Sequence, residues 1–216
     1  MTVIVVGPPG AGVGEVARAL GLRLGLPVVD TDTLVETALG APLAEAFVTG
    51  GESAFREAQS RALATALDGA APTVLAVGSG AVDDAGNRER VLAARRAGAT
   101  VVFVDVGLAD AVRRLALTGS VPGIDGPRAA WQRMMTQRRS VYESLATISV
   151  SSAGADLDHP DGAARLAEEV AEMIPQTRIT QTPTPQTSIT QNPADARIRV
   201  GADDGYDVLI GRDLLD

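Results

Sequence analysis

Apolar residues in most of the chain form short continuous runs, separated by longer segments with apolar positions at helical spacing. Continuous runs of Val, Ile, Leu and Ala are typical of strands buried on both faces of a parallel sheet. The segments between them are long enough for the crossover connections that parallel strands require. The runs predict strands at residues 3–6, 27–29, 73–77, 100–105 and 147–150.

The amphipathic segments predict helices that pack on this sheet. They lie at residues 16–24, 33–38, 43–48, 51–67, 88–97, 108–117, 128–145 and 162–173. Strands that alternate with helices indicate an α/β fold in which a five-stranded parallel sheet carries helices on both faces. We expect this domain to span residues 1–174.

The pattern changes after residue 174. Residues 175–196 are rich in Thr, Gln and Pro and contain an imperfect repeat, at 178–183 and 188–193, which predicts a disordered linker. Residues 197–216 then alternate like two strands around the turn signal Asp203-Asp204-Gly205. Because a lone hairpin has no core, we expect this segment to be the truncated start of a second domain, and the chain to be the front piece of a longer polypeptide.

Composition narrows the function classes. The net charge of −8 argues against a general nucleic-acid binder, and the absence of cysteine excludes disulfides, thiolate metal sites and a cysteine nucleophile. No apolar run approaches the roughly 20 residues of a membrane span, and Met1-Thr2-Val3 has no basic signal-peptide region. We therefore expect a cytoplasmic protein, with the lone His159 as a solvated loop residue.

The first predicted strand leads into a glycine-rich loop, residues 7–15, which a helix follows. The phosphate-binding pattern G-x-x-x-x-G-K-[ST] places backbone N–H groups and a helix N-terminus around a phosphate. Gly7 and Gly12 fit it, but Val13 stands at the lysine position and Gly14 at the hydroxyl position. All 19 basic residues are arginine, so no lysine elsewhere replaces the missing one. A tight turn without a ligand remains the alternative.

Two further segments carry candidate chemistry. Asp30-Thr31-Asp32 ends the second predicted strand, and carboxyl ends of parallel strands are where open α/β sheets bind ligands. Residues 118–127 form a loop rich in Gly and Pro, which we interpret as a mobile lid.

Five motifs, in order, resemble those of the shikimate kinases across residues 1 to about 174. They are Gly7…Gly12, Asp30-Thr31-Asp32, Gly51-Glu52-x-x-Phe55-Arg56, Gly78-x-Gly80-Ala81-Val82 and Gln137-Arg138-Arg139-x-x-Tyr142. The resemblance implies a P-loop fold like that of nucleoside monophosphate kinases, with strand order 2-3-1-4-5. It also implies transfer of the γ-phosphoryl group of ATP, with magnesium, to the 3-hydroxyl of shikimate, on the route to chorismate and the aromatic amino acids.

The resemblance assigns substrate roles to specific residues. Asp32 matches the carboxylate that accepts hydrogen bonds from the substrate hydroxyls and acts as general base. Arg56 and Arg138 match two arginines that clamp the substrate carboxylate through paired hydrogen bonds. Ser79, beside Gly80, replaces the middle glycine of the family's Gly-Gly-Gly turn, which approaches the substrate; its side chain is expected either to crowd the pocket or to form a hydrogen bond into it. The alternative for the arginines is that they are solvated helix charges.

The nucleotide side departs from the family. The implied nucleotide-binding positions are Gly10, Ala11, Gly12, Val13, Gly14 and Glu15, with Asp30 on the magnesium side. Val13 removes a cation, Gly14 removes the hydroxyl that holds magnesium, and Glu15 adds a carboxylate near the α-phosphate. The loop at Ser120-Val121-Pro122 also lacks the family's arginine before proline. These losses predict weak phosphoryl transfer, because this reaction depends on positioning and charge stabilisation.

Three hypotheses follow. The first is a catalytically impaired domain that keeps its shikimate pocket or assists a neighbouring domain. The second is an active kinase in which Arg128, Arg138 or Arg139 replaces the lysine, and the third is a structural spacer. Residues 197–216 resemble the opening of 3-dehydroquinate synthase, an enzyme of the same route, which implies a fusion with that enzyme.

Overall fold

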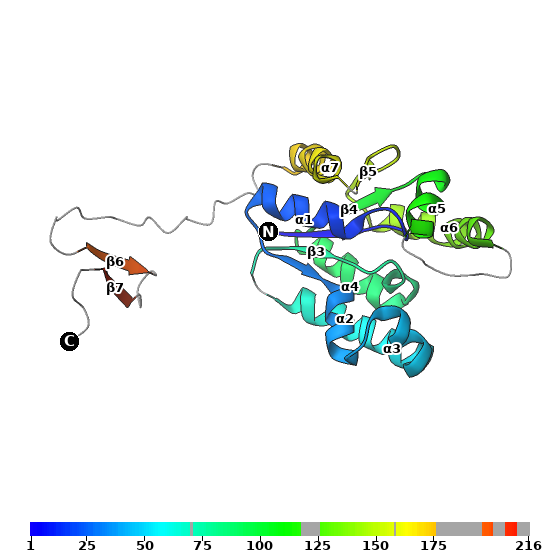
Figure 1. The fold of residues 1–216 in the computed structure, drawn as a ribbon, viewed down its shortest axis with the longest axis horizontal. Coiled ribbons are helices and arrows are strands. Elements are labelled where there is room, and N and C mark those ends of the chain that lie inside the picture. The colour runs from blue at the N-terminus through cyan, green and yellow to red at the C-terminus, as the bar shows by residue number, and fades with distance from the viewer. Residues whose placement is uncertain (70, 118–125, 158, 176–195, 201–205, 211–216) are drawn as a thin grey trace. The chain divides into compact units, whose positions relative to one another are not determined.

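The computed structural model describes residues 1–69, 71–117, 126–157, 159–175, 196–200 and 206–210 (Figure 1). The chain divides into two compact units, Met1–Arg178 and Ile179–Asp216. Three predicted features lie largely outside the described residues. They are the linker, described only at residues 175 and 196, the lid with Ser120-Val121-Pro122, described only at residues 126–127, and the turn at Asp203-Asp204-Gly205. No helix of the described part is long and apolar enough to span a membrane.

The first unit is built on a five-stranded sheet. Its strands are β1 (Thr2–Val6), β2 (Val28–Asp30), β3 (Thr73–Ala76), β4 (Thr100–Asp105) and β5 (Ile148–Ser151). They lie in the order β2-β3-β1-β4-β5, and every neighbouring pair is parallel. The predicted sheet and its order are confirmed. Val3, Ile4 and Val5 of the central strand are fully buried, as expected for a strand covered on both faces.

Helices cover both faces of this sheet (Figure 1). They are α1 (Val13–Leu24), α2 (Thr31–Leu39), α3 (Leu43–Asp68), α4 (Ala85–Arg96), α5 (Leu108–Leu117), α6 (Gly126–Leu145) and α7 (Pro160–Met173). A 3₁₀ turn, η1 (Ala81–Asp83), precedes α4. Helices α1 and α7 pack together, whereas α4 and α6 pack on each other and on β4.

Several predicted helix boundaries were wrong. Helix α1 begins at Val13 rather than 16, so the lysine and hydroxyl positions lie in its first turn. Helix α4 begins at Ala85, and Asp84 caps it by accepting a hydrogen bond from Asn87 N at 2.8 Å. Likewise, His159 is the exposed N-cap of α7. The predicted helices 43–48 and 51–67 form α3, bent at Gly51, whose φ of 77° interrupts the helix.

The second unit contains two described strands, β6 (Ala196–Val200) and β7 (Tyr206–Ile210). They pair antiparallel, with Ile198 opposite Val208. The two strands predicted after residue 195 are therefore present and form a hairpin.

Candidate functional site

The glycine-rich loop connects β1 to α1 and has the backbone of an anion-binding turn. Gly10 and Gly12 have φ values of 82° and 83°, a left-handed conformation that side chains disfavour. The buried Ala11 donates its N–H to Pro8 O at 3.0 Å, and Trp131 Nε1 donates to Pro9 O at 3.0 Å. These contacts hold the loop in front of the N-terminus of α1, where backbone N–H groups favour an anion.

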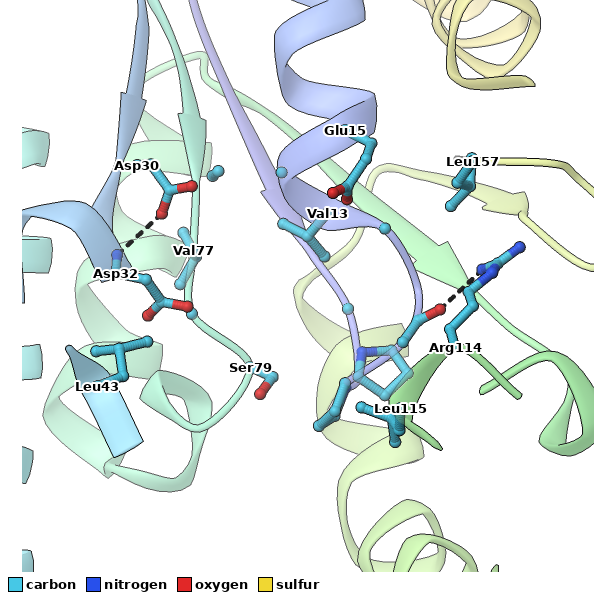
Figure 2. A pocket seen from close by; sticks show the side chains of 18 residues that line it. Val13, Glu15, Asp30, Asp32, Leu43, Val77, Ser79, Arg114, Leu115 and Leu157 are labelled. Carbon is cyan, nitrogen blue, oxygen red and sulfur yellow. Dashed lines mark hydrogen bonds between the residues drawn. The ribbon is translucent and has the colours of Figure 1, made fainter. Parts of the chain in front are cut away.

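A cleft of about 570 Å³ lies between this loop and the ends of β2 and β3 (Figure 2). Its lining includes the loop on one wall, with Gly10, Gly12, Val13, Gly14 and Glu15, and Asp30, Asp32 and Ser79 on the other. The structure therefore brings most of the predicted nucleotide-side residues together with the predicted general base. Ala11 is the exception, because its side chain is buried behind the loop.

The lysine and hydroxyl positions offer no charged or hydroxyl ligand to this cleft. Val13 packs against the hydrophobic core, and a Cβ atom added to Gly7 would lie 3.0 Å from Val13 Cγ2. A Cβ atom added to Gly14 would lie 3.4 Å from Arg18 Nη1 and 3.6 Å from Asp30 Oδ2. Asp30 Oδ1 accepts a hydrogen bond from Asp32 N at 2.9 Å and caps α2. Among the described residues no cluster of three or more acidic or His residues forms a metal site.

Glu15 lines the cleft beside these positions. Its Oε1 atom lies 3.2 Å from Arg18 Nη2, one turn along α1, and both side chains are largely exposed. The Glu15 carboxylate therefore lies at the N-terminus of α1. The resemblance to shikimate kinases implies a Ser or Thr near a phosphate at this position. A carboxylate here repels a phosphate, and the exposed arginine offsets this only weakly.

Asp32 is the titratable group whose environment is best suited to proton transfer. Burial, and to a smaller extent the neighbouring Asp30 and Glu36 carboxylates, together raise the pKa of Asp32 to about 6. The Asp32 carboxylate packs against Gly78, where any side chain would clash with it. Gly78 N donates to Thr31 Oγ1 at 2.9 Å, which holds the ends of β2 and β3 together. A carboxyl with a pKa near neutrality is a competent general base.

The turn after β3 connects the predicted substrate residues. Arg138 Nη1 donates to Ser79 O at 3.4 Å, and Tyr142 OH donates to the same oxygen at 2.8 Å. A Cβ atom added to Gly80 would lie 2.5 Å from Arg56 Nη1, so this glycine permits the close approach of the guanidinium. Arg56 and Gly80 line a second hollow of about 490 Å³. The two predicted arginines therefore meet at one turn, from α3 and α6.

Arg114 and Leu157 are among the lining residues that the sequence did not indicate. Arg114 of α5 donates to Gly10 O at 2.7 Å and to Ala155 O at 2.8 Å, and Leu157 lies against Gly12. Both contacts join segments far apart in the chain, and helical periodicity does not indicate which distant loop a residue reaches.

Of the arginines expected to replace the lysine, Arg139 binds Asp105 at 2.8 and 2.9 Å instead. Arg128, Arg138 and Arg139 are not among the cleft's described lining residues.

The family model described as "SKI: Shikimate kinase" matches residues 9–176. The chain belongs to the shikimate kinase family. It is 41% identical to the shikimate kinase of Frankia casuarinae over 157 residues, which cover 72% of this chain and 67% of that relative. It is 40% identical to the shikimate kinase of Saccharopolyspora erythraea over 180 residues, covering 81% and 94% of the two chains.

Solved structures of shikimate kinases share the fold. The enzyme from Acinetobacter baumannii, solved in complex with shikimate, superposes with a TM-score of 0.71 at 23% identity, covering 82% of this chain and 94% of that one. The enzyme from Bacteroides thetaiotaomicron gives a TM-score of 0.68 at 21% identity, covering 80% and 97%.

Proposed function

We propose that residues 1–174 form a shikimate-binding domain whose kinase activity is strongly reduced. The observation that carries this proposal is the contrast within one cleft. One wall keeps Asp32, with its raised pKa, whereas the opposite wall presents Val13 and Gly14 in place of a lysine and a hydroxyl. The shikimate held by the related Acinetobacter baumannii enzyme supports the choice of ligand.

On the substrate side, each predicted residue has a proposed role. Asp32 accepts hydrogen bonds from ligand hydroxyls and takes a proton from the 3-hydroxyl if transfer occurs. Arg56 and Arg138 bind the ligand carboxylate, since their guanidinium groups approach the same turn from two helices. Ser79 and Gly80 form the floor against which the ring lies.

On the nucleotide side, the backbone fits an anion but the side chains do not fit ATP with magnesium. Losing one preorganised donor in such a site costs roughly 3–4 kcal/mol, and such losses do not add simply. Gly14 provides no side-chain oxygen for the metal, and the oxygen of Asp30 that caps α2 already accepts a hydrogen bond from Asp32 N. We therefore expect the loop to bind an anion only weakly, and we assign no role to magnesium in this cleft.

The test is an assay of ADP release with shikimate, ATP and magnesium, run beside calorimetric titration of each ligand. We expect shikimate to bind and ATP to bind weakly, with turnover more than tenfold below the usual kinase range of about 1–100 s⁻¹. The proposal would be overturned if turnover lay inside that range and if Asp32→Asn abolished it. Failure of both ligands to bind would indicate a structural spacer.

Arg114 favours a second candidate, an active kinase with a non-standard loop. This arginine lines the cleft and contacts the loop through Gly10 O. Its Nη atoms also donate to Ser152 O and Ala155 O, both at 2.8 Å, so it acts first as a brace of the loop. The assay above distinguishes this candidate from the first.

We further propose that residues 175–196 are a linker and that residues 197–216 begin a 3-dehydroquinate synthase-like domain. The hairpin of β6 and β7 at the predicted strand positions supports a folded body after the linker. An antibody raised against residues 1–174 should detect a single polypeptide much larger than 22.1 kDa in extracts of the source organism. A band near that mass would contradict the fusion.

A further inference from the structure

Asp83 lies between the two arginines of the proposed carboxylate clamp. It is the last residue of η1, which follows the Ser79-Gly80 turn. Its Oδ2 atom forms an ion pair with Arg138 Nη2 and lies 4.0 Å from Arg56 Nη2. One carboxylate oxygen is therefore shared between guanidinium groups from α6 and α3.

This arrangement has the same chemistry as the proposed contact with a ligand. Two guanidinium groups converge on a carboxylate, and charge-assisted hydrogen bonds of this kind are the strong ones in proteins. Only 18% of the Arg138 side chain is exposed, so its bond to Asp83 is partly shielded from water. While Asp83 stays in place, it competes with a ligand carboxylate for the Nη2 donors of both arginines.

The surrounding charges reinforce the effect of Asp83. The hollow that contains Arg56 is also lined by Glu52, Glu57, Asp83 and Asp84. Glu52 Oε1 lies 3.6 Å from Arg56 Nε. An incoming carboxylate therefore meets an arginine that already has acidic partners, in a hollow with an excess of negative charge.

We propose that Asp83 occupies the carboxylate-binding place of the Arg56–Arg138 pair, and that a carboxylate ligand binds by displacing it. The inference rests on the function proposed above, because it concerns the ligand of that same clamp. Asp83 thereby lowers the affinity of the two arginines for carboxylates. Only a ligand whose contacts outweigh the loss of the Asp83 ion pair binds there.

The local structure allows the Asp83 side chain to leave without moving its backbone. Arg88 Nη1 donates to Val82 O and to Asp83 O, both at 2.8 Å, which fixes the end of η1. The Asp83 side chain is 38% exposed, so a rotation about its own bonds brings the carboxylate into water.

The test compares Asp83→Asn with Asp84→Asn by calorimetric titration, using shikimate and cyclohexanecarboxylate as ligands. Asparagine keeps the shape of aspartate and removes its charge. Asp84 is a matched control, because it lies in the same hollow but serves as the N-cap of α4, a position that asparagine fills equally well. We expect Asp83→Asn to tighten shikimate binding about three- to thirtyfold, and Asp84→Asn to change it less than about twofold.

The outcomes separate this inference from the proposed function. Unchanged or weaker shikimate binding in Asp83→Asn overturns the inference alone, since a purely structural ion pair predicts lower stability without a gain in affinity. Equal gains in both variants also overturn it, because they would reflect the general charge of the hollow.

Tighter cyclohexanecarboxylate binding in Asp83→Asn, without preference for shikimate, supports the inference and contradicts the shikimate assignment. If neither ligand binds any variant, both fall. Asp83→Ser serves as a second variant if Asp83→Asn unfolds.

Discussion

At the scale of single residues, the cleft differs from an ordinary phosphate-binding site at three consecutive positions, Val13, Gly14 and Glu15. Val13 and Gly14 lie in the first turn of α1, where the backbone already points its N–H groups at the cleft. If the kinase activity is reduced as proposed, the missing side chains are its expected cause, because the backbone of the loop is kept. Restoring them should therefore restore a measurable part of the activity.

We expect Val13→Lys combined with Gly14→Ser to raise kcat/KM for shikimate phosphorylation by about 100-fold or more, because each recovered donor is worth roughly 3–4 kcal/mol. The ADP-release assay measures this gain. Val13→Met with Gly14→Ser is the matched control, since it adds length at position 13 without charge. Equal activities in the two double variants would show that the loop's charge is not what limits turnover.

Asp32 gives a prediction about stability and pH. Its pKa is raised from 3.8 to about 6, so the folded state binds this proton more tightly than the unfolded state does. The contribution of Asp32 to the free energy of unfolding therefore falls as pH rises from about 4 to 6 and then stays level. Each pKa unit is about 1.4 kcal/mol, so the ionised carboxylate costs the folded state on the order of 1–3 kcal/mol above pH 6.

Asp32→Asn should remove this cost. We expect the variant to unfold at a temperature several degrees above that of the wild type at pH 8, and at nearly the same temperature at pH 4. Glu36→Gln removes one of the charges that raise the pKa of Asp32, and should give a smaller gain at pH 8. A pH-independent difference between Asp32→Asn and wild type would contradict the raised pKa.

At the scale of elements, Arg114 connects three segments. It joins α5 to the glycine-rich loop at Gly10 and to the segment after β5 at Ser152 and Ala155. Ser152 and Ala155 are buried, and the guanidinium supplies a hydrogen bond to each of their carbonyl groups; Ser152 O also accepts one from Ala155 N at 3.1 Å. The loop's position is therefore a property of the packing between elements as well as of its own glycines.

Arg114→Ala should lower the free energy of unfolding by about 2–4 kcal/mol, since it removes the hydrogen bonds that Arg114 donates to Gly10 O, Ser152 O and Ala155 O. The neighbouring Arg113 is the control, because it pairs with Asp110 at 2.9 Å from a largely exposed position. Arg113→Ala should change stability by less than about 1 kcal/mol. Chemical denaturation of both variants measures the difference, and equal effects would exclude the bracing role.

The elements also show which features the sequence could predict. The five strands followed from continuous apolar runs, because burial on both faces leaves a pattern that local sequence carries in full. Helix starts were misplaced at Ala85 and Pro160 because their caps, Asp84 and His159, precede the apolar pattern that defines the helix. Arg114 and Asp83 were missed as site residues because their partners lie far along the chain. The turn of the glycine-rich loop, in contrast, was predictable because the glycines that permit it are close together in the sequence.

At the scale of the whole molecule, the first unit has a complete core of its own. The core residues run from Val3 on β1 to Ile174 after α7, and all lie within Met1–Arg178. A two-stranded hairpin such as β6 and β7 is at best marginally stable by itself. The stability of the first unit is therefore expected to be independent of the second.

A chain that ends at Arg178 should thus unfold at the same temperature as the 216-residue chain, within about 1 °C, and should bind shikimate with the same affinity. Differential scanning calorimetry and titration of both proteins measure this. A chain ending at Glu169 is the informative control, because it removes the buried Val170 and Ile174 from the core and should lose several kcal/mol. If the chain ending at Arg178 were also destabilised, residues 179–216 would have to pack on the kinase-like unit. The segment would then belong to that unit's fold and could not simply be the start of a neighbouring domain.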